Sequence, residues 1–135
     1  MSIDASDHVA ILMLYGEYNR AIDAGDVEGW LATFVKDGAF RHPLRSYVGE
    51  AELREFVTTR SAALGANPIA ELKHWNDPIA LHGNGTMATG SCRLLVAGVA
   101  RDTGKPQIVT RGHYEDLMER TSDGWRYKER RLTIL

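Results

Sequence analysis

The hydrophobic pattern of the chain changes near residue 68, and this change limits the folds that it can adopt. Before it, apolar residues recur at three- and four-residue spacing, which is typical of helices with one buried face. After it, long segments of strand-forming residues are separated by short turns that contain glycine. Helices followed by a group of strands indicate an α+β fold.

The sequence predicts three helices in the first half of the chain, and Asp26 and two glycines mark their limits. Ser6 or Asp7 can cap the first helix, and Gly25 is placed to end it. Asp26 is a natural cap for the second helix, and Gly49 precedes the third. We expect the helices at residues 7–24, 27–34 and 50–64, with a short strand at 39–42.

The second half predicts a meander of four strands, at residues 71–82, 86–100, 107–120 and 125–135. Asn84-Gly85 between the first two is a strong hairpin turn. Strands of this length must twist and curl. With the helices packed on one side, a strongly curved, mostly antiparallel sheet would form a cone with an internal pocket.

Size, charge and termini exclude several classes of protein. With 135 residues and 44% hydrophobic content, we expect one domain over residues 1–135. The net charge of −2 offers no basic surplus for nucleic acid. The polar, acidic N-terminus lacks the basic and apolar parts of a signal peptide, and the longest apolar run near it, residues 9–15, is far below the roughly 20 residues of a membrane span. We therefore expect a cytoplasmic protein without membrane contact.

Motifs for metals and cofactors are missing from the sequence. There is no His-x-His pair, and Cys92 is the single cysteine, so it cannot form an intrachain disulfide. No glycine-rich loop joins a strand to a helix to hold a phosphate. We therefore expect neither a metal nor a cofactor.

Several motifs, in this order, resemble the SnoaL-like family of the nuclear-transport-factor-2-like superfamily. The resemblance covers nearly the whole chain and rests on residues 18–26, 34–39, 47–50, His74, 112–117 and 123–127. The superfamily includes dehydratases, a dehydrochlorinase, isomerases, polyketide cyclases and non-catalytic members. The resemblance also implies that the protein forms a homodimer through the open face of the sheet.

Tyr18, Asp23 and His74 match the positions of a site in some dehydratase and dehydrochlorinase relatives. The resemblance implies that His74 is a general base and that Asp23 orients it. Each residue also has a structural interpretation: a solvated Asp before a helix end, a structural His in a strand, and a core Tyr. A further carboxylate of some dehydratase relatives has no counterpart here, because residues 94–98 are wholly apolar.

An inward arginine and several aromatic residues complete the predicted site. Arg130 and Arg131 point to opposite faces of the last strand, so one of them can face the pocket, and Arg130 better matches the family position. His42 is expected at the surface or in a turn, and Asn19 could hydrogen-bond Asp23. The expected substrate-binding wall consists of Trp30, Phe40, Phe56, Trp75 and Tyr114.

Together these features predict a cofactor-independent enzyme that transfers protons on a small, largely apolar and cyclic molecule. The reaction would be of the lyase (dehydratase-like) or isomerase/cyclase type. The alternative is a non-catalytic member of the same fold that binds a small molecule or serves as an assembly subunit.

Overall fold

The computed structural model describes residues 2–135 and contains three α-helices, one 3-10 turn and seven strands. The α+β prediction is confirmed. The elements follow the order α1 (Ala5–Ala24), α2 (Val27–Leu31), β1 (Phe34–His42), β2 (Arg45–Val48), α3 (Glu50–Ala63), η1 (Leu64–Ala66), β3 (Ile69–Asn76), β4 (Ala80–Gly83), β5 (Met87–Ala100), β6 (Pro106–Thr121) and β7 (Gly124–Ile134).

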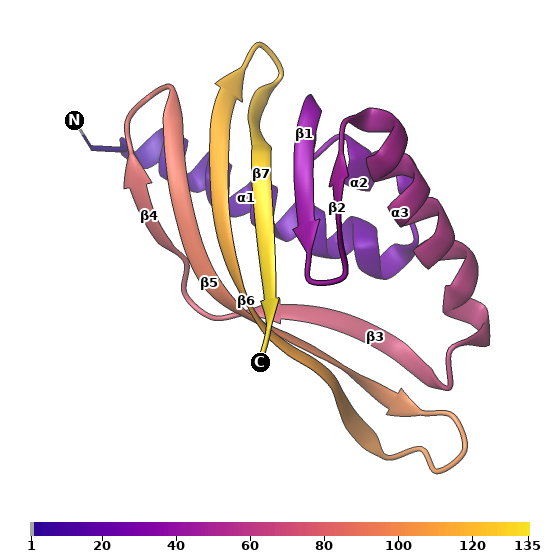
Figure 1. Ribbon diagram of the computed structural model, residues 1–135. Coiled ribbons are helices and arrows are strands. Elements are labelled where there is room, and N and C mark those ends of the chain that lie inside the picture. Colours follow the sequence, from indigo (N-terminus) through magenta and orange to yellow (C-terminus); the bar gives the residue numbers. More distant parts are fainter. Residues whose placement is uncertain (1) are drawn as a thin grey trace.

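The seven strands form one sheet in the order β2-β1-β7-β6-β5-β3, with β4 paired to β5. Neighbouring strands are antiparallel except for β1 and β7, which are parallel. Figure 1 shows α1 crossing one face of the sheet, with α3 beside β1 and β2. The far halves of β5 and β6 bend away together with β3, which gives the sheet its curl. Register shifts in the β3–β5 and β5–β6 pairings lie in this bent part, as expected of bulges that increase twist.

Helix α1 begins slightly earlier than predicted. Its N-cap is Asp4, whose carboxylate accepts the main-chain N–H of Asp7 at 2.8 Å. Asp7 is instead buried and accepts the indole N–H of Trp125 at 3.0 Å. The predicted end is confirmed, because Gly25 terminates the helix with a φ of 70°.

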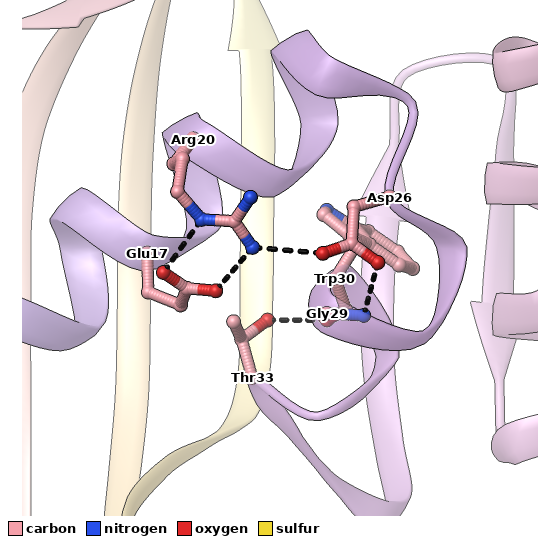
Figure 2. A network of polar contacts seen from close by, with 6 residues as sticks. All are labelled: Glu17, Arg20, Asp26, Gly29, Trp30 and Thr33. Atoms are coloured by element: carbon pink, nitrogen blue, oxygen red, sulfur yellow. Dashed lines mark hydrogen bonds and ion pairs between the residues drawn. The ribbon is translucent and has the colours of Figure 1, made fainter.

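The junction of α1 and α2 is held by a small polar network (Figure 2). Arg20 pairs with Glu17 at 2.6 Å and with Asp26 at 2.8 Å, and Asp26 accepts the N–H of Gly29 at 2.9 Å. The ion pairs are exposed and contribute little to stability. The Asp26 cap fixes where α2 starts, and so how the chain leaves the end of α1.

The structure differs from the prediction in four places. The strand expected at residues 39–42 already begins at Phe34. The second helix ends at Leu31 instead of residue 34, because the carbonyl of Thr33 already accepts the N–H of Tyr127 at 2.8 Å and the chain joins β7 as strand β1. The predicted strand 71–82 is two strands, β3 and β4, separated by the segment that contains Pro78, which has no N–H for the ladder. Strand β2 had not been predicted.

The core lies between α1 and the concave face of the sheet and is rich in aromatic rings. Tyr18 lies 5.7 Å from Trp30 and 5.6 Å from Tyr127, centroid to centroid, and Trp30 lies 4.9 Å from Phe34. All four side chains are buried. Among residues 2–135, none of the helices combines the length and the apolar character that a bilayer crossing requires.

Candidate active site

The last turn of α1 and the end of β3 bring Asp23 and His74 together. Asp23 Oδ1 lies 2.6 Å from His74 Nδ1, and the main-chain N–H of His74 donates to Asp23 Oδ2 at 3.0 Å. Their side chains are only 7% and 8% exposed, respectively. One carboxylate therefore holds both the backbone and the ring of His74, which fixes the imidazole in position.

This contact assigns the proton of the imidazole ring. A carboxylate accepts a hydrogen bond, so Nδ1 carries the hydrogen and Nε2 keeps its lone pair in the neutral ring. Burial lowers the pKa of His74, the hydrogen bond and charge of Asp23 oppose this, and the charges of Arg60 and Arg130 lower it further. The neutral imidazole is therefore the favoured form near pH 7.

A bulge in β3 sets the direction in which His74 points. The pairing with β5 shifts register between Ala70 and Lys73, and Glu71 within it has a φ of 55°, a conformation that non-glycine residues rarely adopt. After the bulge, Leu72 and His74 face the inside of the cone. Because side chains in a strand alternate, Trp75 faces outward.

His74 lines a cavity of about 150 Å³ inside the cone. Its apolar wall combines aromatic and aliphatic side chains from the helices and the sheet, including Phe40, Phe56, Leu94 and Leu132. Such a wall excludes water and strengthens the electrostatic interactions within it.

Two buried tyrosines lie in the wall of this cavity. Tyr18 and Tyr114 both line it and are 2% and 1% exposed, with ring centroids 6.2 Å apart. Burial raises the pKa of Tyr114 well above its usual value, and the neighbouring Tyr18 adds to the effect. Tyr114 therefore stays a neutral phenol at all ordinary pH values and remains a possible hydrogen-bond donor.

Arg130 points inward, and Arg131 has a side chain that is 57% exposed. The Arg130 guanidinium is fully buried, lies 3.3 Å from the centroid of the Tyr114 ring, and donates from Nε to Asp116 at 3.0 Å. It is not among the residues that line the cavity; its guanidinium packs against the rings of Tyr18 and Tyr114, which do line it. The prediction that Arg130 faces the pocket therefore needs correction.

Asp116 is a buried carboxylate that had not been predicted from the sequence. It pairs with Arg130 across β6 and β7 and accepts the hydroxyl of Tyr15 at 2.5 Å. Burial raises the pKa of Asp116, and the charge of Arg130 and the bond from Tyr15 oppose this. The inward alternation of Tyr114, Asp116 and Met118 could have revealed it.

The predicted aromatic wall is only partly assembled. Phe40, Phe56 and Tyr114 line the cavity. Trp30 is fully buried in the core behind it, packed against Phe34 and Phe56, and does not reach the space. Trp75 is 61% exposed on the outer face, so its assignment to the wall needs correction.

Other polar residues take places that had not been predicted. His42, expected at the surface or in a turn, lines the cavity, and burial lowers its pKa. Arg60, Asn67 and Thr110 line it as well. Asn19 does not bond to Asp23; its amide donates to Asn76 Oδ1 at 2.8 Å.

A larger groove of about 690 Å³ lies elsewhere, between α2, α3, β1 and the β6–β7 turn. It is open and contains charged side chains of both signs, such as Glu28, Lys36 and Arg126. None of its lining residues is a histidine, cysteine or tyrosine. The smaller cavity, with a paired imidazole in its wall, is therefore the better candidate for proton chemistry.

Comparison with known proteins agrees with this architecture. The family model of the SnoaL-like domain matches residues 4–131. The chain belongs to the SnoaL-like family. None of the curated proteins matches its sequence.

Solved structures with the same fold include proteins from three bacteria. ActVI-ORFA of Streptomyces coelicolor is 26% identical, with a TM-score of 0.80 over 94% of this chain and 96% of its own. A protein of unknown function with a cystatin-like fold from Nostoc punctiforme is 25% identical, with a TM-score of 0.83 over 100% and 96%. A variant of Rv3472, a protein of unknown function from Mycobacterium tuberculosis, is 26% identical, with a TM-score of 0.80 over 94% and 70%.

Proposed function

We propose that this SnoaL-like protein is a cofactor-independent enzyme that transfers a proton on a small, largely apolar ring compound. The observation that carries the proposal is the imidazole of His74, held at Nδ1 by a buried carboxylate in the wall of an apolar cavity. An engineered protein cavity of roughly the same volume, about 150 Å³, holds one benzene molecule. The part of the substrate inside the cavity is therefore one ring of about six atoms.

In this mechanism, His74 Nε2 removes a proton from a carbon next to an activating group, or from a carbon vicinal to a leaving group. Asp23 keeps the ring in the productive tautomer and stabilises the imidazolium that forms. A positioned base of this kind contributes roughly 10²–10⁴-fold to the rate. The products would be an alkene, a shifted double bond or a closed ring, as in lyases and isomerases.

Tyr18 and Tyr114 supply the donor that such a reaction needs. A phenol that stays neutral can donate to a carbonyl or to a departing oxygen as charge develops there. Arg130, stacked on the Tyr114 ring, is a positioning residue in this scheme. Its guanidinium lies over the tyrosine rings and does not line the cavity.

Deuterium exchange into a panel of ring compounds tests the proposal. Single-ring ketones, hydroxylated rings and halogenated rings would be screened in D₂O by ¹H NMR for exchange or elimination. We expect His74→Ala and Asp23→Asn to lose the activity found in the wild type by about 100-fold or more. His113→Ala, a histidine outside the cavity that pairs with Glu115, is the matched control and should retain it. Full activity in His74→Ala would sink the proposal.

A binding role without catalysis is the second candidate. Leu94 and Val96 line the cavity in the stretch where some dehydratase relatives carry a further carboxylate. An apolar wall at this place suits ligand binding without catalysis. Saturable binding of ring compounds with no exchange or elimination in the same screen would favour this role. A homodimer through the open sheet face, where Trp75 is exposed, also stays a prediction.

A further inference from the structure

Arg60 is the one permanently charged side chain among the residues that line the His74 cavity. It lies in the last turn of α3, and its side chain reaches the same space as Phe56, one turn earlier on that helix. The other lining residues are apolar or carry neutral polar groups, apart from the two titratable imidazoles. The cavity therefore holds a positive charge with no carboxylate in its wall.

Within residues 2–135, Arg60 has no ion-pair partner and no side-chain hydrogen bond. Its Nε is fully buried and lacks an acceptor. Arg54, on the same helix, shows the contrast, because it pairs with Glu28 at 2.6 Å and with Glu50 at 3.7 Å. A guanidinium has five N–H donors in a planar fork, and leaving a buried donor unpaired is costly.

The position of Arg60 relative to the base matters for the reaction. Arg60 and His74 both line this one cavity of about 150 Å³. Groups bound to both would therefore lie on one small ligand. Asn67 and Thr110 line the same cavity and add neutral polar groups that could accompany a charged one.

We propose that Arg60 binds an anionic oxygen group of the substrate, which makes the ligand a single-ring carboxylate or ionised enol. Guanidinium and carboxylate match in geometry and in charge, and such bonds are about twice as strong as neutral ones. This inference rests on the proposed function for the reaction, and it names the substrate class. The oxyanion would anchor the ring while His74 acts on a C–H elsewhere on the ring, next to an activating group or vicinal to a leaving group.

Binding of three ring probes tests the assignment, measured by isothermal titration calorimetry. Benzoate is the carboxylate, 1,3-cyclohexanedione supplies an ionised enol, and benzamide is the neutral analogue of benzoate. We expect at least one anion to bind about 10-fold or more tightly than benzamide. The tighter of the two anions identifies the source of the oxyanion.

Variants assign the effect to Arg60. Arg60→Gln should weaken binding of that anion by about 10- to 100-fold and leave benzamide binding unchanged. Arg60→Lys keeps the charge and should retain part of the affinity. Arg111→Gln, an exposed arginine on the outer face beside Trp75, is the matched control and should bind like the wild type.

Two results would overturn the inference. One is equal affinity of the anion for the wild type and Arg60→Gln; the other is that no anion binds better than benzamide. Binding is measured without turnover, so these results stand whether or not His74 transfers a proton. Loss of exchange activity in His74→Ala, in turn, says nothing about Arg60, so the two proposals fail separately.

Discussion

The carboxylate of Asp23 binds His74 twice, at ring Nδ1 at 2.6 Å and at the main-chain N–H at 3.0 Å. The end of a helix and a strand of the sheet are thereby joined by one side chain. The same contact determines which imidazole nitrogen faces the cavity. Asp23 consequently contributes both to the stability of the fold and to the proposed chemistry. Different substitutions of Asp23 can separate these two contributions.

Asp23→Ala should destabilise the fold more than Asp23→Asn does. Alanine leaves the buried N–H of His74 without an acceptor, which costs about 1–3 kcal/mol. Asparagine keeps one oxygen for that N–H, so its cost is smaller. Urea denaturation of the two variants measures the difference in the free energy of unfolding, and equal stabilities would contradict the double role of the carboxylate.

Asp23→Asn should lower the pKa of His74 further. In the wild type, burial lowers this pKa and Asp23 opposes it, so removal of the charge leaves burial unopposed. A histidine whose folded pKa lies below its unfolded value of about 6.5 loses stability as pH falls below that value. The variant should therefore lose more stability than the wild type between neutral pH and pH values below the unfolded pKa. NMR titration of the imidazole checks the pKa, and an unchanged or raised value would contradict the prediction.

Asp116 and Arg130 form a buried ion pair, and removal of either partner alone should lower the stability of the fold. Asp116→Leu leaves the fully buried guanidinium uncompensated and should lower the free energy of unfolding by about 3–5 kcal/mol. The double variant Asp116→Leu/Arg130→Met should recover most of that loss. Removal of the exposed partner of Arg54 by Glu28→Gln is the control and should change little. Additive losses in the double variant would show that the two residues are not coupled.

Cys92 should be almost unreactive in the native protein. It is 4% exposed, and burial raises the pKa of its thiol to about 12. Little thiolate exists at pH 8, so labelling with iodoacetamide should be far slower than in urea, where the thiol is free. Equal labelling rates in the two conditions would be inconsistent with the burial of Cys92 in strand β5.

The sequence predicted the elements whose limits depend on local chemistry. Gly25 ends α1 and Asn84-Gly85 turns the strands because both features act over a few residues. The strand predicted at residues 71–82 runs through Pro78, which has no N–H to donate to the ladder and lies between two strands in the structure. The bulge at Glu71 could not be foreseen, because a glutamate in the left-handed region reflects tertiary packing instead of local preference.

The site was predictable only in part, for a similar reason. Asp23 and His74 were matched through the family resemblance, whereas Arg60 and Asp116 acquire their importance from their surroundings in the fold. Asp116 has Arg130 and Tyr15 as partners, while Arg60 has none among residues 2–135. Whether a charged residue is paired or left free inside a cavity depends on three-dimensional packing, which a single sequence does not reveal.

The protonation of the His74 ring tests the central claim most directly. In protein labelled with ¹⁵N-histidine, two-dimensional NMR at pH 7.5 distinguishes the imidazolium from the two neutral tautomers. The structure predicts a neutral ring with hydrogen on Nδ1 and a free lone pair on Nε2, where it can accept a proton from a ligand. Hydrogen on Nε2, or a doubly protonated ring, would contradict the account of His74 as a base held by Asp23.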